Sequence, residues 1–207
     1  MIAPNGVDLT CYRIVEKTAA RQRLGLPKDS LIVLYTGSFQ GWKGIETIIQ
    51  AASDLASYHF YFVGGSEKNL RQLGFEGQIS FNVHFAGKRD FKEMPLWHKS
   101  ADVLLVTGTR KDEYSYYHTS PMKLFEYMAA RTPIVASRTP AIEQVVSERE
   151  VFFHRPDDSD DLKKIIQFVF NNREEAQKRA QSVYRKAQEL SWDSRAKKIL
   201  GFIKERL

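Results

Sequence analysis

The stretch Leu31-Ile-Val-Leu-Tyr-Thr36, closed by Gly37, is the pattern that decides the fold class. A short apolar run rich in β-branched residues is typical of a strand that is buried on both faces. Five further apolar runs follow it, and segments with helical spacing separate them. The expected strands cover residues 31–36, 58–63, 83–85, 102–106, 133–136 and 151–153.

Between these runs, apolar residues recur at intervals of three and four, as in a helix that packs on a sheet. Pro95 and Pro121 each fall in the first turn of an expected helix, where proline is tolerated. Ser120 stands in the preferred capping position before Pro121, and Asp157-Asp158 precede another helix as capping residues. The expected helices begin at 43 and 120 or cover 67–73, 93–101, 140–146, 162–170, 176–187 and 192–203.

Strands that are joined through helices pair in parallel, because each crossover needs a connection of that size. The 207 residues therefore predict one doubly wound α/β domain. It has a six-stranded, parallel, Rossmann-like sheet with helices on both faces and a helical C-terminal tail. In such sheets the ligand binds beyond the carboxyl ends of the strands. The loops expected to line a site follow Thr36, Val63, Phe85, Val106 and Ala136, and several are rich in Gly and Lys or Arg, which favours a phosphate-bearing ligand.

Composition narrows the class of protein. With 43% apolar and 27% charged residues, the chain resembles an ordinary globular protein, which excludes a disordered chain, a collagen-like repeat and a disulfide scaffold. The net charge of +6 suits an anionic ligand or an acidic membrane surface and is weak evidence for nucleic acid. The single cysteine, Cys11, fits a reducing compartment. No apolar run approaches the ~20 residues of a membrane-spanning helix, and the first residues do not form a signal peptide, so we expect a cytoplasmic protein.

Two segments combine features that bind anions. In residues 37–44, three glycines and Lys43 lie between a strand and a helix, so backbone N–H groups and an ammonium can approach a phosphate. At Ser120 a helix begins whose free N–H groups face the carboxyl edge of the sheet, and Lys123 and Glu126 are neighbours on it. Neither segment is a P-loop or a dinucleotide motif. The plain alternatives are a glycine turn with a solvated lysine, and a surface ion pair on a packed helix.

Three other residues carry weaker signals. Lys88 and Arg89 follow the third strand, where they could approach an anion or line a base pocket, and solvated surface is the alternative. His118 is a lone histidine, which is more often structural than catalytic. No spacing of His and Cys suggests zinc, no acidic pair resembles a divalent-metal ligand set, and nothing resembles a nucleophile elbow.

Taken in order, the motifs resemble the C-terminal half of a group 1 (family 4) glycosyltransferase of GT-B fold. The resemblance covers nearly the whole chain, and its block at 120–129 is the most specific. Each motif alone is weak, and the ordered set is strong. The matching stretches are Pro-Asn-Gly-Val-Asp at 4–8, Tyr-Thr-Gly-Ser-Phe-x-x-Trp-Lys-Gly at 35–44, Phe-Val-Gly-Gly at 62–65, Val-His-Phe-Ala-Gly at 83–87, Ser-Ala-Asp-Val-Leu-Leu-Val at 100–106, Ser-Pro-Met-Lys-Leu-Phe-Glu-Tyr-Met-Ala at 120–129, Pro-Ile-Val-Ala-Ser at 133–137, Pro-Asp-Asp at 156–158 and Ser-Trp at 191–192.

The resemblance implies a single domain over 1–207 that binds the nucleotide of a UDP- or GDP-linked sugar donor. It implies a retaining transferase whose N-terminal acceptor domain is absent from this chain. On this matching Lys43 contacts the donor diphosphate, and the backbone around Gly37 and Ser38 faces it across the cleft. The backbone near Ser120, Pro121 and Met122 cradles a phosphate, although Pro121 has no N–H to give.

The same matching assigns residues to the nucleoside and shows two departures from the family's pattern. Glu126 is the second glutamate of the family's Glu-x7-Glu pattern and would accept hydrogen bonds from the ribose hydroxyls, while Lys88 and Arg89 flank the base. The first glutamate of the pattern falls on His118, which leaves Lys43 and His118 as the candidate catalytic residues. A basic residue that often precedes the lysine falls on Ser38, and we expect Lys123 to replace its charge.

The expected activity is sugar transfer to a glycan or a lipid-linked acceptor, in glycan or cell-surface polysaccharide synthesis. No metal or other cofactor is expected, since the protein supplies the cations, and the chain alone is expected not to turn over. The alternative is a non-catalytic, nucleotide-binding regulatory module on the same fold. A nucleic-acid binder ranks low, because no basic aromatic strand pair is evident. The basic residues at the C-terminus permit peripheral membrane contact of the full enzyme, and a solvated helix face is the simpler account: Lys197, Lys198, Lys204 and Arg206.

Overall fold

The computed structural model describes residues 3–12 and 16–206 of the chain, and its centre is one parallel sheet. The strand order is β3-β2-β1-β4-β5-β6, which confirms the predicted doubly wound arrangement. The six strands are β1 (Leu31–Thr36), β2 (Tyr58–Val63), β3 (Val83–Gly87), β4 (Val103–Val106), β5 (Ile134–Ser137) and β6 (Phe152–His154).

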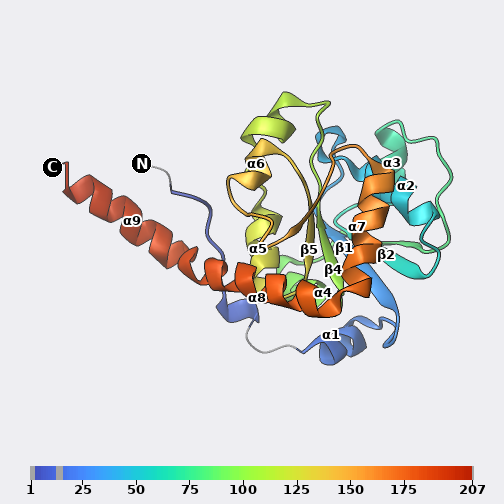
Figure 1. Ribbon diagram of the computed structural model, residues 1–207, viewed down its shortest axis with the longest axis horizontal. Coiled ribbons are helices and arrows are strands. Elements are labelled where there is room, and N and C mark those ends of the chain that lie inside the picture. The colour runs from blue at the N-terminus through green and yellow to red at the C-terminus, as the bar shows by residue number, and fades with distance from the viewer. Residues whose placement is uncertain (1–2, 13–15, 207) are drawn as a thin grey trace.

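Helices cover both faces of the sheet (Figure 1). On one face lie α1, α4, α5, α6 and α8, and on the other lie α2, α3 and α7. Helix α9 projects from the body of the domain, and the chain near Val7 is bound to the residues just before it (Figure 1). The helices are α1 (Lys17–Leu24), α2 (Ile45–Ser53), α3 (Glu67–Gln72), α4 (Met94–Ser100), α5 (Met122–Ala130), α6 (Pro140–Glu143), α7 (Ser159–Asn171), α8 (Arg173–Glu189) and α9 (Trp192–Lys204), with short turns η1 (Thr10–Tyr12), η2 (Gly41–Lys43), η3 (Phe91–Glu93) and η4 (Tyr114–His118).

Strand β1 lies in the middle of the sheet and is buried on both sides. Ile32 and Leu34 pack with the residues of α4 and α5, while Val33 and Tyr35 pack with those of α2 and α7. Since successive side chains of a strand point to opposite faces, both sets must be apolar. This explains why the run that decides the fold does not alternate between apolar and polar residues.

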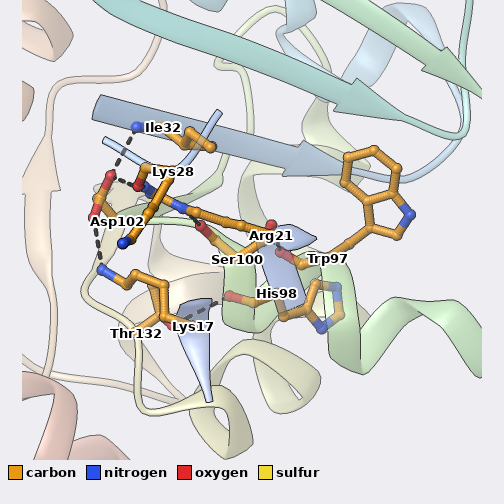
Figure 2. Close-up of polar contacts among 9 residues, drawn as sticks. All are labelled: Lys17, Arg21, Lys28, Ile32, Trp97, His98, Ser100, Asp102 and Thr132. Carbon is orange, nitrogen blue, oxygen red and sulfur yellow. Dashed lines mark hydrogen bonds and ion pairs between the residues drawn. The ribbon is translucent and has the colours of Figure 1, made fainter. Parts of the chain in front are cut away.

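Helix α1 is an element that the sequence pattern did not predict. Its sequence is mostly polar, and its buried residues include Arg21. The Arg21 guanidinium donates to the carbonyls of Ser100 and Lys28 and to the Asp102 carboxylate (Figure 2). Asp102 also accepts hydrogen bonds from Lys17 and from the backbone N–H of Ile32. One carboxylate therefore fixes α1 to the beginnings of β1 and β4.

Two local predictions near the β4–α5 connection are wrong. Helix α5 begins at Met122, with Pro121 as its capping residue in an extended conformation. Ser120 is therefore not the N-cap, and its hydroxyl instead accepts a hydrogen bond from Asn5. The loop expected after Val106 contains a π-helical turn, Tyr114–His118, which follows Asp112 and is stabilised by the bond from the Ser115 N–H to the Asp112 carboxylate. The predicted cap at Asp158 is present, with its side chain bonded to the Asp161 N–H.

Candidate functional site

The loop after β1 is held against the loop after β2 by two glycines. The N–H of Gly37 donates to the carbonyl of Val63 at 2.7 Å. Gly37 has φ +130° and Gly64 has φ +104°, a region that favours glycine. A Cβ on Gly64 would lie 2.7 Å from the Gly37 carbonyl carbon, so only glycine fits there. The loop is thereby fixed at the carboxyl edge of the sheet, where parallel sheets bind ligands.

Lys43 lies at the far end of this loop, on the turn η2. Its ammonium donates to the carbonyl of Ser38 at 3.1 Å and to the Ser38 hydroxyl at 2.9 Å. It also lies 5.0 Å from the ring centroid of Trp42. Partial burial lowers the pKa of Lys43, which means that its charge lacks full solvation. The structure therefore brings Ser38 and Lys43 together, with the loop closed on itself by these two bonds.

Lys123 reaches the same loop from the first turn of α5. Its ammonium lies 3.5 Å from the ring centroid of Tyr35 and would be 3.2 Å from a Cβ on Gly37. No hydrogen bond or ion pair joins this ammonium to any residue that the structure describes. Burial lowers the pKa of Lys123 well below its usual value, and the charge of Lys43 lowers it further. Two cations thus meet the loop after β1, Lys123 beside Gly37 and Lys43 at Ser38, and an anion bound there would offset their charge.

Glu126 lies on α5 one turn beyond Met122, on the same side of the helix. Burial raises the pKa of its carboxyl, and the charge of Lys123 opposes that rise. The carboxylate has no hydrogen bond or ion pair within the described ranges. Glu126 and Met122 both line a cavity of about 710 Å³. A carboxylate in such a place can accept hydrogen bonds from hydroxyl groups of a ligand.

The cavity lies between the N-terminal segment, α4, α5 and α9. Its wall is largely apolar, which suits a planar ring, and Glu126 gives it an acceptor for hydroxyl groups. The hydroxyl of Tyr12, which is part of the wall, is 2.8 Å from Nδ1 of the buried His98. The other residues of the wall are Gly6, Val7, Asp8, Cys11, Arg23, Phe91, Lys92, Met94, Pro95, Leu96 and Trp192.

The beginning of α5 offers backbone donors at this edge. Because the first N–H groups of a helix have no partner inside it, those of Met122 and Lys123 are available, whereas that of Leu124 donates to the Pro121 carbonyl. The partial positive charge of a helix N-terminus favours an anion at this place. Lys123 therefore combines a backbone donor and an ammonium in one residue.

Three predicted site residues lie apart from this cluster. Lys88 and Arg89 are exposed, and neither lines the cavity. Arg89 donates to the Ala86 carbonyl, and its guanidinium lies 6.0 Å from the ring of Trp97. His118 is exposed at the end of η4, and no hydrogen bond or ion pair ties it to another residue in the described part of the chain.

Sequence patterns missed several residues that the structure places at the site. Tyr35 lies inside an apolar run, so nothing marked its hydroxyl as special. Asn5 binds Ser120 through its amide and accepts a hydrogen bond from Arg195 of α9 at 2.8 Å. A 115-residue separation from Ser120 hides such a contact from any local pattern. The apolar residues of the cavity wall read simply as core or surface positions.

Two further features are absent from residues 3–12 and 16–206. No three His, Cys, Asp or Glu side chains gather there as a metal-ligand set. No helix there has the length and apolar character that crossing a membrane requires.

Comparison with known proteins identifies relatives over most of the chain. The family described as "Glycosyl transferases group 1" matches residues 16–186. D-inositol 3-phosphate glycosyltransferase 2 of Catenulispora acidiphila is 27% identical over 158 residues, which is 69% of this chain and 35% of that protein. The D-inositol 3-phosphate glycosyltransferase of Mycobacterium tuberculosis is 30% identical over 139 residues, 64% of this chain and 28% of that protein. The chain thus spans about a third of the length of these curated relatives.

Solved structures share the fold. Sucrose-phosphate synthase from Thermosynechococcus elongatus matches 99% of this chain and 52% of its own, with a TM-score of 0.84 and 26% identity. HepE from Anabaena, solved with UDP and glucose, matches 97% of this chain and 55% of its own, with a TM-score of 0.78 and 20% identity. The C-terminal domain of LpcC, a group 1 glycosyl transferase of Francisella tularensis, matches 87% of this chain and 95% of its own, with a TM-score of 0.67 and 19% identity.

Proposed function

The chain belongs to the group 1 glycosyl transferases, and on that basis we propose that it forms the donor-binding half of a retaining enzyme of this family. Its ligand is the nucleoside diphosphate of a UDP- or GDP-linked sugar. The observation that carries the proposal is the pair of cations beside the loop after β1: the charge of Lys43 lowers the pKa of Lys123, and neither ammonium forms an ion pair with a described residue. A diphosphate between them removes that repulsion.

The diphosphate is bound by backbone and side-chain donors together. The N–H groups of Met122 and Lys123 at the start of α5 and the two ammonium groups surround the same edge of the sheet. Lys43 exchanges its bonds to Ser38 for bonds to phosphate oxygens. Charge-assisted hydrogen bonds of this kind contribute about 1.5–3 kcal/mol each. HepE, which binds UDP and UDP-glucose, supports this class of ligand.

The nucleoside lies toward the cavity beside α5. Its ribose hydroxyls donate to Glu126, whose carboxylate makes no hydrogen bond or ion pair with a described residue, and its base extends along the apolar wall that contains Phe91 and Met94. Lys88 and Arg89 are exposed just before this wall, so in this proposal they flank the base only from outside.

The proposed chemistry follows from where charge develops. As the glycosidic bond breaks, negative charge grows on the departing diphosphate. Lys43, Lys123 and the N–H groups of α5 stabilise that charge more strongly in the transition state than in the ground state. No metal has a role in this scheme, because the protein supplies the cations. By sequence matching, His118 stands at the first-glutamate position of the family's pattern, and in this scheme it contacts the donor sugar.

The acceptor is a glycan or a lipid-linked molecule, which a further domain of the full enzyme binds. The chain by itself therefore binds donor but does not transfer sugar. Peripheral membrane contact, if the full enzyme has it, would involve the basic residues of α9.

Calorimetric titration of the chain with UDP, GDP and ADP, and with the sugars linked to each of these nucleotides, tests the proposal. We expect one-to-one binding of UDP or GDP, and at least tenfold weaker binding of the matching nucleoside, which lacks the phosphates. Failure of every nucleoside diphosphate to bind at millimolar concentration would overturn the proposal. Sugar transfer by the chain alone would overturn the expectation that it is inactive by itself.

A second candidate is a non-catalytic nucleotide-binding module. The bonds from Lys43 to Ser38 favour it, because they close the loop on itself. If the loop stays closed, Lys43→Met leaves UDP or GDP affinity unchanged. The donor-binding proposal instead expects a loss of about 10- to 100-fold, since the variant removes a charge-assisted bond. Lys68→Met, at an exposed position on α3, is the matched control and leaves affinity unchanged.

A further inference from the structure

Tyr35 carries a polar atom that its surroundings do not explain. The residue is 1% exposed, and its hydroxyl has no hydrogen-bond partner in the described part of the molecule. Its ring packs against the rings of Phe39 and Phe62. A buried hydroxyl without a partner is costly, and phenylalanine would fill the same space without that cost. The hydroxyl therefore needs a function that the ligand-free protein does not show.

Among residues 3–12 and 16–206, two other buried polar atoms share this lack of a partner, and both lie elsewhere. The unpaired atom of Asn82 is its side-chain oxygen, whereas its amide nitrogen donates to the carbonyls of Ala52, Leu55 and Tyr58. Trp97 belongs to α4, where Arg89 lies over its ring. Tyr35 differs from them, because it lies at the carboxyl end of β1 beside the proposed diphosphate site.

The Tyr35 hydroxyl and the Lys123 ammonium flank the same point. A Cβ on Gly37 would lie 3.2 Å from the ammonium nitrogen and 3.7 Å from the phenol oxygen. The ammonium has three donors, and it lies over the face of the Tyr35 ring, 3.5 Å from the ring centroid. The Tyr35 hydroxyl, which can accept a hydrogen bond and receives none, thus lies near the Lys123 ammonium, whose donors have no acceptor among the described residues. Because Gly37 has no side chain, the space between the hydroxyl and the ammonium is open.

We propose that Tyr35 is a positioning residue: its hydroxyl accepts a hydrogen bond from Lys123 when a phosphate draws the ammonium over Gly37. This inference rests on the proposed function. A short movement of the ammonium along the ring, from its face toward the phenol oxygen, makes the bond. One donor of Lys123 then binds Tyr35 and fixes the direction of the others, which bind the phosphate. Like charge from Lys43 disfavours this position until the phosphate is present.

A double-mutant cycle tests the inference. Affinity for UDP, or for GDP if that is the diphosphate bound, is measured for wild type, Tyr35→Phe, Lys123→Met and the double variant. We expect Tyr35→Phe to weaken binding about 5- to 10-fold, as for one net hydrogen bond. In the Lys123→Met background the same change has no further effect. Urea unfolding of Tyr35→Phe shows stability equal to or greater than wild type, because an unpaired hydroxyl is removed.

The control is Tyr61→Phe, on the adjacent strand, which leaves affinity unchanged. Unchanged affinity of Tyr35→Phe would overturn the inference, and so would a loss that persists undiminished in the Lys123→Met background. Both results would leave the proposed function standing, since wild type still binds. If wild type binds no nucleoside diphosphate, the proposed function fails and this inference fails with it.

Discussion

Gly64 packs so closely on Gly37 that a Cβ at position 64 would lie 2.7 Å from the Gly37 carbonyl carbon and 2.8 Å from its oxygen. Two loops that are separate in sequence therefore share one backbone contact beneath the proposed diphosphate site. Because backbone cannot move aside as a flexible side chain can, any substitution at Gly64 displaces the loop that carries Ser38 and Lys43.

Gly64→Ala is accordingly expected to lower both stability and ligand affinity. Overpacking of this kind costs about 1–3 kcal/mol, and the φ of +104° adds strain for alanine. Urea unfolding and titration with UDP or GDP measure the two effects. Gly41→Ala is the control within the same loop, because a Cβ there meets nothing within 4 Å and the φ is ordinary. Equal behaviour of the two variants would contradict the prediction.

Glu126→Gln is expected to weaken UDP or GDP binding about tenfold, because a neutral amide accepts hydroxyl hydrogen bonds less strongly than a carboxylate. The loss should vanish for an analogue that lacks both ribose hydroxyls, and an equal loss with that analogue would rule out the ribose contact. Burial raises the pKa of Glu126. Wild-type affinity should therefore fall as the pH drops through that raised pKa, and calorimetry at several pH values should show a flatter profile for the glutamine variant.

His98 makes the stability of the fold sensitive to acid. Burial lowers its pKa to about 3, and the charge of Lys123 contributes. The His98 imidazole takes up a proton near pH 6.5 in the unfolded chain and does not do so in the folded chain. The free energy of unfolding is therefore fully retained above pH 6.5 and decreases as the pH falls toward 3. At about 1.4 kcal/mol per pH unit, His98 alone should lower the free energy of unfolding by about 2 kcal/mol between pH 6.5 and 5.

Urea unfolding across this pH range measures the slope. His98→Asn should flatten it, although the variant is less stable at neutral pH, because Tyr12 and Thr36 lose a partner. His118→Asn, at an exposed position, should leave the slope as in wild type. A slope that His98→Asn does not change would assign the acid sensitivity to other groups, of which His154 is the next, since burial lowers its pKa to about 4.

Asp102→Ala should be strongly destabilising without affecting the ligand site. The carboxylate binds Arg21 at 2.8 Å, Lys17 at 2.6 Å and the Ile32 N–H at 2.8 Å (Figure 2), and the Arg21 side chain is only 5% exposed. Removing one partner of a buried pair costs about 3–5 kcal/mol. Urea unfolding should show this loss, whereas Asp160→Ala, which breaks an exposed pair with Lys163, should leave the free energy of unfolding close to that of wild type.

The sheet could be predicted from sequence because its signal is local. Each strand is a short apolar run, and the observed ends differ from the predicted ones by at most two residues, the largest difference being at β3. Helix α1 escaped prediction because its stability comes from Arg21 and Asp102, which are 81 residues apart. The helix start at α5 was misplaced for a similar reason: the hydroxyl of Ser120, which a local rule assigns to capping, is engaged by Asn5.

The candidate site could be predicted only in part. Gly37, Lys43, Lys123 and Glu126 follow strand ends or begin a helix, and the parallel sheet brings such positions to one edge. The structure does gather them, while the roles assigned to them stay predictions. The cavity wall and the hydroxyl of Tyr35 could not be predicted, because they depend on how α4, α9 and the N-terminal segment pack together.

The amide of Asn5 bonds to Ser120 on one side and to Arg195 on the other. The leading segment and the projecting helix α9 are thus tied at one point to the entrance of α5. A mechanical force applied near either end of the chain would therefore act on the beginning of α5 before it acted on the sheet. We therefore expect handles for force spectroscopy, or fused reporter domains, to perturb the proposed nucleotide site unless a flexible linker separates them from residues 5 and 195.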